Sequence, residues 1–334
     1  MSIFLFAINA VLPLVLLILL GYLLRRMGFF TDEFLKIGNK VVFRVALPAL
    51  LFYNVYSVKS FAEIRMSAVL YSLCVVLLLF FLGLLTVRFF VPVRAQRGAA
   101  LQCVFRSNYA ILGVSLVEAL GITGGNAHAA VMSAFAIPLF NVLAVFVLSV
   151  YGEDCEVKFT SVLKKIAKNP LILGVLAGFL ALGLRALLPV GADGLPVFSL
   201  QGDLKFLYSA IASLAKMSSP LALLVLGGSF QLSAAKGYLP QILYGTLWRI
   251  LLAPTVAILG AYFLCRAGVL SFDAADYAVL LALFGSPVAV SSAIMAREMK
   301  SDATLAGQYV VYTSVFSVFT IFGFILLLRA FALI

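Results

Sequence analysis

The sequence predicts an all-α membrane protein of ten transmembrane helices in two inverted halves. Hydrophobic residues fill 64% of the 334 positions and charged residues only 11%. The mean hydropathy of +1.16 lies far outside the range of soluble domains. Apolar runs of about 20 residues, the length that crosses the hydrocarbon core as a helix, recur throughout. The period-2 alternation of a membrane β-barrel is absent, so helices are the available way to satisfy the backbone in lipid.

Ten such runs are expected to form helices, and no polar stretch between them is long enough for a soluble domain. They cover residues 3–24, 34–56, 64–90, 98–120, 127–151, 170–188, 204–230, 240–266, 276–297 and 305–331. The first run has neither a basic leading segment nor a cleavage site, so we expect a retained helix rather than a signal peptide.

The second half of the chain repeats motifs of the first in the same order. Pro13–Leu23 returns as Pro170–Leu180, with proline, leucine, glycine and aromatic positions in register. In the second and seventh spans, Arg44–Pro48 matches Lys216–Pro220, each with a cation one turn before a proline. Because five spans make up each half, the second copy is expected to be inverted, which is a hallmark of secondary transporters.

The halves comprise residues 1–151 and 170–334, joined by a linker over residues 152–169. Connections after odd-numbered spans carry thirteen Lys and Arg residues, and the remaining connections carry six. The positive-inside rule therefore places the linker in the cytoplasm and both termini outside. Topology and anionic lipid explain the net charge of +11, so a nucleic-acid partner is not expected.

The fourth and ninth spans are the least lipid-like. Arg106–Gly113 and Gly285–Ser292 place small, polar and helix-breaking residues at mid-membrane, where an unsatisfied backbone group costs several kcal/mol. If both helices unwind and cross there, half-helix N-termini offer N–H groups and positive dipole ends to an anion, and freed carbonyls can hold a cation. The alternative is a pair of plain kinks with small-residue helix packing.

Asn108 is the leading candidate for substrate contact, because its amide both donates to a carboxylate and accepts from a hydroxyl; an interhelical hydrogen bond is the alternative. Arg106 either meets an anion or snorkels to the surface, since a charge at mid-bilayer costs about 2.5–3.5 kcal/mol. The same alternative holds for Arg44 and Lys216. The predicted substrate-binding set is Arg106, Ser107, Asn108, Tyr109, Ser286, Pro287 and Ser291, with Arg44, Lys216 and Gly113 as accessory residues.

Titratable groups give no clear sign of ion coupling. The acidic residues nearest the membrane are Glu118, Asp276 and Glu298, all near span ends, so a buried carboxylate pair is not expected. His128, the only histidine, opens the fifth span, and an interfacial polar role is favoured over a proton relay. Coupling to H⁺ or Na⁺ therefore stays open, and no cofactor or bound metal is predicted. No Walker A or hydrolase motif is present, so enzyme activity is not expected.

At these positions the chain resembles the auxin efflux carrier family, in particular its bacterial malonate and malate permease-like branch. The resemblance covers nearly the whole length and rests on Leu12–Leu23, Ala46–Phe52, Arg106–Gly113 and Ser286–Val290. It implies a fold similar to sodium/bile-acid symporters, with a scaffold domain of spans 1, 2, 6 and 7 and a transport domain of spans 3–5 and 8–10. It also implies a homodimer in the plasma membrane, the inner membrane of a bacterium, and an elevator-like movement of the transport domain.

By the same resemblance, Asn108 takes the place of the family's asparagine at the span-4 crossing, and Pro287 that of the proline at the span-9 crossing. Ser115 departs from the family, which often has proline there. The predicted function is a gradient-driven carrier of small organic anions, such as malonate, malate or auxin-like acids. Two alternatives remain: sodium-coupled symport of amphipathic anions such as sterol acids, and a non-transporting membrane sensor or scaffold.

Overall fold

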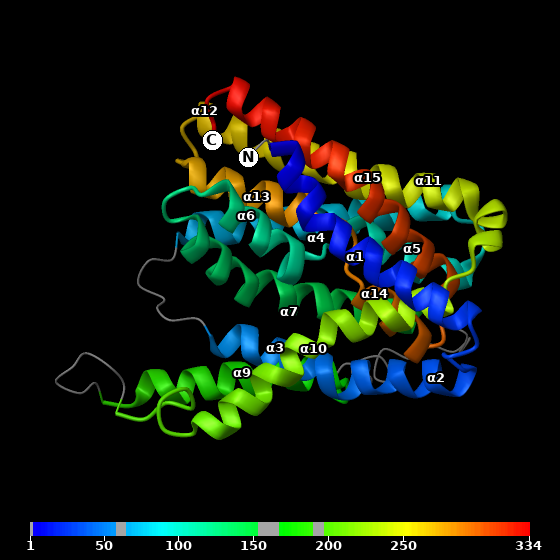
Figure 1. Cartoon of the computed structure of the whole chain (residues 1–334). Coiled ribbons are helices and arrows are strands. Elements are labelled where there is room, and N and C mark those ends of the chain that lie inside the picture. The colour runs from blue at the N-terminus through cyan, green and yellow to red at the C-terminus, as the bar shows by residue number, and fades with distance from the viewer. Residues whose placement is uncertain (1–2, 58–64, 153–166, 190–196) are drawn as a thin grey trace.

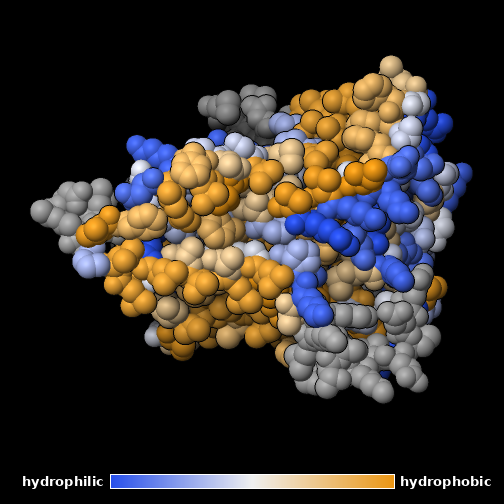
Figure 2. Space-filling view, turned by 90° about the horizontal axis from the view of Figure 1, so that it is seen from below, coloured by the Kyte–Doolittle hydropathy of each residue, from blue (hydrophilic) through white to orange (hydrophobic). Residues whose placement is uncertain are grey.

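The computed structural model describes residues 3–57, 65–152, 167–189 and 197–334, which form helices, loops and one isolated β-bridge (Figure 1). Six described helices are long and apolar enough to cross a membrane: Met66–Phe90, Gly125–Tyr151, Pro170–Leu187, Lys205–Ser229, Ser233–Arg266 and Ala303–Ala330. Figure 2 shows hydrophobic side chains over much of the face in view and hydrophilic side chains gathered at one end. The prediction of a helical, multi-pass membrane protein is confirmed.

The helices follow one another in two series. The first series is α1 (Ile3–Arg26), α2 (Asp32–Val41), η1 (Val42–Ala46), α3 (Leu47–Tyr56), α4 (Met66–Phe90), α5 (Arg94–Phe105), η2 (Tyr109–Gly113), α6 (Val114–Leu120) and α7 (Gly125–Tyr151). The second is α9 (Pro170–Leu187), α10 (Lys205–Ser229), η3 (Leu232–Tyr238), α11 (Leu239–Leu247), η4 (Trp248–Leu252), α12 (Ala253–Arg266), α13 (Ala274–Gly285), α14 (Ser291–Glu298) and α15 (Ala303–Ala330).

Three short elements, η1, η2 and η4, are π-helical turns, which insert a residue into an α-helix and are frequent at functional sites. Prolines follow two of them, Pro48 in α3 and Pro254 in α12. In a regular helix, each ring would crowd the carbonyl four residues earlier. At the matching place after η2 stands Ser115, whose hydroxyl donates to the Ile111 carbonyl oxygen at 2.8 Å. The departure from the family's proline therefore leaves the π turn in place.

Helices α1, α3, α9 and α10 pack together: α1 crosses α10, and α3 packs against α9 and α10 (Figure 1). Gly21 of α1 lies against the main chain of Leu224, and Gly227 of α10 lies against that of Ile18. A Cβ atom at either glycine would overlap the facing carbonyl oxygen. Close approach at small residues supplies the packing energy that hydrophobic burial does not supply in lipid. A larger side chain at either glycine would therefore separate the two helices.

The other helices enclose the two broken spans. α5 packs against α4, α7 and α15, while α13 packs against α7, α12 and α15. α14 continues the second broken span and packs along α15. The interior of this group contains fully buried large side chains, among them Leu101, Phe105, Leu148 and Phe284. Both broken spans are thus surrounded by protein along much of their length.

A cluster of charged residues joins the starts of α4, α7 and α13. The guanidinium of Arg65 lies 2.9 Å from the carboxylate of Asp276 and 3.0 Å from that of Asp273. Nδ1 of His128 lies 3.1 Å from Oδ1 of Asp276. Asp276 begins its helix as expected, yet it is only 2% exposed, so one carboxylate is buried although Asp273 beside it is not. Arg65 thus pairs with both carboxylates, and the ligand atoms of His128, Asp273 and Asp276 lie within 4.8 Å of one another.

Most of the predicted linker, residues 153–166, lies outside the described residues. Asn169, the last linker position, accepts a hydrogen bond from the Leu171 N–H at 2.9 Å. An asparagine N-cap followed by Pro170 at the first helical position is a favourable helix start. The first helix of the second half therefore begins at the residue that the sequence predicts.

Candidate functional site

The two broken spans cross through non-helical segments. The chain leaves the helical conformation between α5 and η2, and again between α13 and α14. In these gaps Ser107 and Val288 form an isolated antiparallel β-bridge. The Asn108 N–H donates to the Pro287 carbonyl oxygen at 2.7 Å. The segments in which the sequence predicts helix breaks are thus joined main chain to main chain.

Other main-chain groups of the crossing also find partners inside the protein. The Val288 N–H donates to Oγ1 of Thr313 in α15 at 3.1 Å. The hydroxyl of Ser286 donates to the carbonyl oxygen four residues earlier at 2.6 Å. The carbonyl oxygen of Asn108 accepts from the Leu112 N–H at 2.9 Å. Because unwound backbone at membrane depth requires such partners, these contacts make the segments stable crossings rather than plain kinks.

Tyr109 and Gly113 hold η2 in place rather than line a cavity. The Tyr109 ring is fully buried, and its hydroxyl donates to the Ala129 carbonyl oxygen of α7 at 3.1 Å. Gly113 has no room for a side chain, because a Cβ atom would overlap the Tyr109 ring and lie 3.0 Å from the Ala282 carbonyl oxygen. These two predicted site residues therefore have packing roles between η2, α7 and α13.

A cavity of about 50 Å³, here called the central cavity, lies between the crossing and helices α3, α9 and α10. Its polar lining combines predicted and unpredicted residues. They are Arg106, Ser107, Asn108 and Ser291 from the broken spans, Asn141 from α7, and Ser218 and Ser219 from α10. Apolar side chains such as Leu47, Leu51, Ile137 and Leu171 close the rest. The cavity is thus shared between the two groups of helices.

Arg106 places a buried positive charge on this cavity. Its side chain is 4% exposed, so it does not snorkel to the surface. Nη1 donates to Gln102 Oε1 at 2.9 Å and contacts the sulfur of Met295 at 2.7 Å. Nη2 donates to Asn141 Oδ1 at 2.9 Å and to Ser291 Oγ at 2.8 Å. All four partners are neutral, and no described carboxylate forms an ion pair with Arg106. The charge is therefore held in position but not compensated.

Three polar atoms at the central cavity are buried without a hydrogen-bond partner among the described residues: Asn108 Nδ2, Ser107 Oγ and Ser218 Oγ. Leaving a buried polar group unsatisfied costs about 1–3 kcal/mol, and each such group needs an explanation. All three atoms belong to residues that line the central cavity. Ser218 is not in the predicted set, although it lies inside the repeated segment Lys216–Pro220.

The remaining predicted residues do not line the central cavity. Ser286 and Pro287 are buried in the crossing, where they serve its main-chain geometry. Arg44 and Lys216 are exposed. The symmetry that singles out these two cations therefore does not bring them to the central cavity in this structure.

A second buried arginine lies behind the crossing. Arg249 of η4 is 0% exposed and lines no part of the central cavity. It donates to the carbonyl oxygens of Val104 in α5, at 3.3 Å, and Phe284 in α13. Arg249 is not among the predicted site residues. The available signal was a cation within an apolar span, which is costly in a membrane and therefore a functional candidate.

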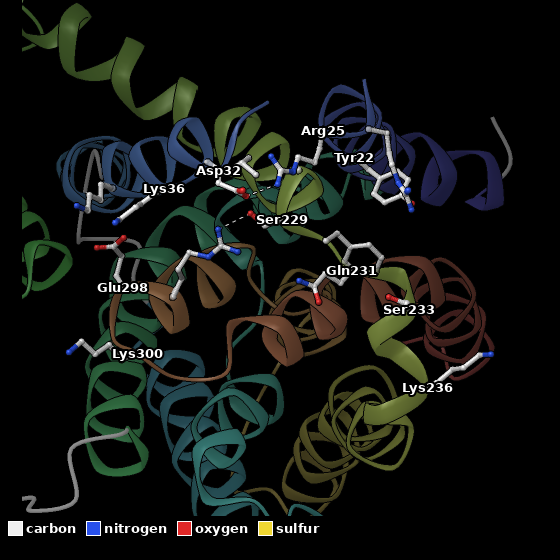
Figure 3. A pocket seen from close by; sticks show the side chains of 16 residues that line it. Tyr22, Arg25, Asp32, Lys36, Ser229, Gln231, Ser233, Lys236, Glu298 and Lys300 are labelled. Atoms are coloured by element: carbon white, nitrogen blue, oxygen red, sulfur yellow. Dashed lines mark hydrogen bonds and ion pairs between the residues drawn. The ribbon is translucent and has the colours of Figure 1, made fainter. Parts of the chain in front are cut away.

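A larger cavity of about 1280 Å³ opens where α1, α2, α10, η3 and α14 meet, and Figure 3 shows its polar side chains (Figure 3). We call it the basic vestibule. Its seven cations are Arg25, Arg26, Lys36, Lys40, Lys236, Arg297 and Lys300. Among the described residues, two acidic side chains, Asp32 and Glu298, also line it. Such an excess of one charge raises the local concentration of anions.

The contact between α10 and α14, here called the seam, leads from the vestibule to the central cavity. Ser218, in the middle of α10, and Ser291, at the start of α14, line the central cavity, whereas Ser229 and Arg297, near the ends of the same two helices, line the vestibule. A smaller cavity of about 20 Å³ lies between them. Arg297 Nη1 donates to Ser229 Oγ across the seam at 2.7 Å.

Comparison with known proteins assigns the chain to a family. A family model described as membrane transport protein matches residues 6–154 and 155–325, and the two matches meet inside the predicted linker. No match to a curated protein was found. The chain is therefore a membrane transporter that belongs to the membrane transport protein family, the family of auxin efflux carriers and malonate permease-like proteins.

Proposed function

We propose that this transporter is a secondary carrier for small organic anions, with mono- and dicarboxylates such as malonate, malate or auxin-like acids as the substrate class. The observation that carries the proposal is the uncompensated guanidinium of Arg106 beside unpartnered polar atoms at the central cavity. A buried charge without a counter-ion is unfavourable, and a carboxylate ligand would supply that counter-ion.

Binding would divide between charge and hydrogen bonds. The Asn108 amide and the Ser107 and Ser218 hydroxyls have free donors for carboxylate oxygens. α14 begins at Ser291 on the cavity wall, so the positive end of its dipole adds to the charge of Arg106. A single carboxylate satisfies this set, and a second carboxylate would need room that a cavity of about 50 Å³ does not have while the helices stay closed.

The ten-span fold of two inverted halves, residues 1–151 and 170–334, belongs to the same proposal. Helices α1, α2, α3, α9 and α10, with η1 between α2 and α3, would form the scaffold, and the other helices would form the moving transport domain. The close packing of α1 on α10 supports a rigid scaffold. A cavity shared by both groups supports an elevator-like movement, because sliding one group past the other would carry the crossing and its ligand across the membrane.

The basic vestibule would face the cytoplasm, as the positive-inside rule predicts, and would collect anions for the seam. The contacts across the seam would then act as a gate. Asn39 Nδ2 of α2 donates to Glu298 Oε1 at 2.8 Å, and Arg297 binds Ser229. Both pairs join a proposed scaffold helix to α14, so both must break when the transport domain moves. Dimerisation through the scaffold completes the proposal.

Transport by the purified protein tests the function. Proteoliposomes on a solid-supported membrane would be challenged with malonate, malate, succinate, indole-3-acetate and a bile acid, with and without sodium, and radiolabel counterflow would detect electroneutral exchange. We expect saturable transport of at least one small carboxylate that Asn108→Ala abolishes. Asn54→Ala is the matched control, because Asn54 is half-buried in α3 and does not line the central cavity.

Three outcomes would contradict parts of the proposal. No flux of any acid in either assay would favour the sensor alternative. A strict sodium requirement with preference for the bile acid would favour the sterol-acid symporter. Normal transport by Asn108→Ala would show that the protein is a carrier whose substrate does not bind at Asn108 in the crossing.

A further inference from the structure

Arg249 is a buried cation that substrate binding does not use. It lies in η4, which packs against α5, α13 and α15 rather than against the central cavity. No described carboxylate forms an ion pair with it. A charge that is removed from water without a counter-ion is strongly unfavourable unless other groups compensate it. The compensating groups are main-chain carbonyls.

These carbonyls belong to two different helix ends. Val104 and Phe284 each lie one residue before the last position of their helices, α5 and α13. The last four carbonyls of an α-helix have no partner within the helix. Arg249 donates Nη1 to Val104 and Nη2 to Phe284, so one guanidinium binds a free carbonyl from each helix.

The electrostatics of the two ends make this arrangement necessary. Each helix C-terminus carries about half a negative charge, and two such ends repel when they converge. The planar guanidinium carries a full positive charge and presents its donors in a fixed fork. It therefore compensates both ends and fixes the distance between them. Lysine supplies the charge, but as a point rather than a fork.

The surrounding structure holds Arg249 at this position. Pro254 follows η4 and favours the π turn that carries the arginine. Gly245, one turn before, has no room for a side chain, because the Tyr309 ring of α15 packs against it. The Tyr309 hydroxyl donates to the Gln241 carbonyl oxygen at 2.8 Å. α15 therefore anchors the helix that presents Arg249.

We infer that Arg249 is a positioning residue that clamps the ends of α5 and α13 and so sets the geometry of the substrate site. Arg106 directly follows α5, and Asn108 comes two residues later. Ser291, which begins α14, follows α13 after the second crossing segment. The clamp itself is independent of transport, whereas its effect on substrate affinity rests on the proposed function.

Hydrogen exchange tests the clamp without any substrate. The full-length protein in lipid nanodiscs would be compared with Arg249→Met, Arg249→Lys and Arg88→Met, where Arg88 is an exposed arginine of α4. We expect Arg249→Met to raise exchange about tenfold, the effect of one lost hydrogen bond, in peptides covering Cys103–Ala110 and Phe284–Val290. Arg249→Lys should restore most of the protection, and Arg88→Met should resemble the wild type.

Two results would overturn the clamp: wild-type exchange at the crossing in Arg249→Met, or an increase spread evenly over all helices. If Arg249→Met does not fold, Arg249→Gln, which keeps one amide donor without the charge, tests the same point and should show the same local increase.

Counterflow tests the positioning role. We expect Arg249→Met to raise KM about tenfold and Arg249→Lys to keep KM within about threefold. A merely structural residue would lower the maximal rate with the amount of folded protein and leave KM unchanged, and that outcome would overturn the inference. If the wild type transports and Asn108→Ala does not, an unchanged KM in Arg249→Met rejects only the positioning role. If the wild type moves no substrate, the exchange result still decides the clamp.

Discussion

The two buried arginines of the crossing differ in what they bind. Arg106 binds side-chain acceptors from α5, α7 and α14 and borders the central cavity. Arg249 binds main-chain carbonyls at two helix ends and does not line the central cavity. Side-chain amides and hydroxyls can rotate to other partners when a ligand arrives, whereas a helix-end carbonyl cannot. Arg106 is therefore placed to bind a ligand, and Arg249 is placed to hold the helices around the binding site.

The largest expected effect comes from removing each charge in turn. Arg106→Met should raise KM about 10- to 150-fold, because hydrogen bonds to charged groups contribute about 1.5–3 kcal/mol. The unfolding temperature should fall less in Arg106→Met than in Arg249→Met. The second variant leaves two buried carbonyls without a donor, and each costs about 1–3 kcal/mol. Counterflow measures the first quantity. Fluorescence of Trp248, the only tryptophan and the neighbour of Arg249, follows the second.

The comparison would fail if the two variants changed KM and the unfolding temperature in the same proportion. Arg106→Lys provides a control for charge alone, since an ammonium group has three donors and cannot reproduce the planar fork.

A smaller effect is expected from replacing Asn141, the residue of α7 that binds Arg106. In Asn141→Leu the guanidinium loses the acceptor at 2.9 Å and becomes free to turn from the cavity. KM should rise about tenfold, with a loss of about 1–3 kcal/mol in the free energy of unfolding. Saturation curves and chemical denaturation in detergent measure these quantities. An unchanged KM would mean that Arg106 does not need this partner to face the ligand.

Ser218→Ala tests whether α10, a helix of the proposed scaffold, contributes to ligand binding. Its hydroxyl has no partner among the described residues, so removing it should leave stability unchanged or slightly higher. A lost hydrogen bond to the ligand would raise KM about two- to tenfold, from about 0.5–1.5 kcal/mol. Ser213→Ala is the matched control, because Ser213 is an exposed serine of the same helix that bonds its own helix backbone. Equal KM values for both variants would show that the Ser218 hydroxyl of α10 does not bind the ligand.

The smallest effect is expected from the exposed pair of cations. Arg44→Gln and Lys216→Gln should each keep KM within about twofold, because both side chains are exposed and neither lines the central cavity. Uptake at low and at physiological ionic strength would show whether they contribute to attraction at long range. A tenfold change in KM from either variant would show that the exposed side chain reaches the substrate in another state of the carrier.

The crossing could be predicted from the sequence because each of the two broken spans has an unusual residue composition. Arg106–Gly113 and Gly285–Ser292 combine polar, small and helix-breaking residues that lipid does not tolerate, and they occur in matching spans. Helix breaks are local properties of a segment. The residue types that cause helix breaks can therefore be recognised in the sequence without knowing which helices surround the segment.

The role of the charged residues could not be predicted in the same way, because it depends on partners from distant segments. Asp276 is buried by Arg65 and His128, which come from the starts of other helices. Arg249 is bound by main-chain carbonyls, which leave no trace in a side-chain pattern. Arg44 shows the converse, since its symmetry with a second cation suggested a site, whereas its side chain is exposed and does not line the central cavity in this structure.

The β-bridge between Ser107 and Val288 has a consequence for how this family can diversify. Since the bridge uses only main-chain atoms, substitutions of the side chains that it presents leave the crossing intact. A change at Ser107 would therefore alter the polar lining of the central cavity while the main-chain connection between the two broken spans stays in place. The crossing is in this respect comparable to an antibody framework, whose backbone supports different side chains.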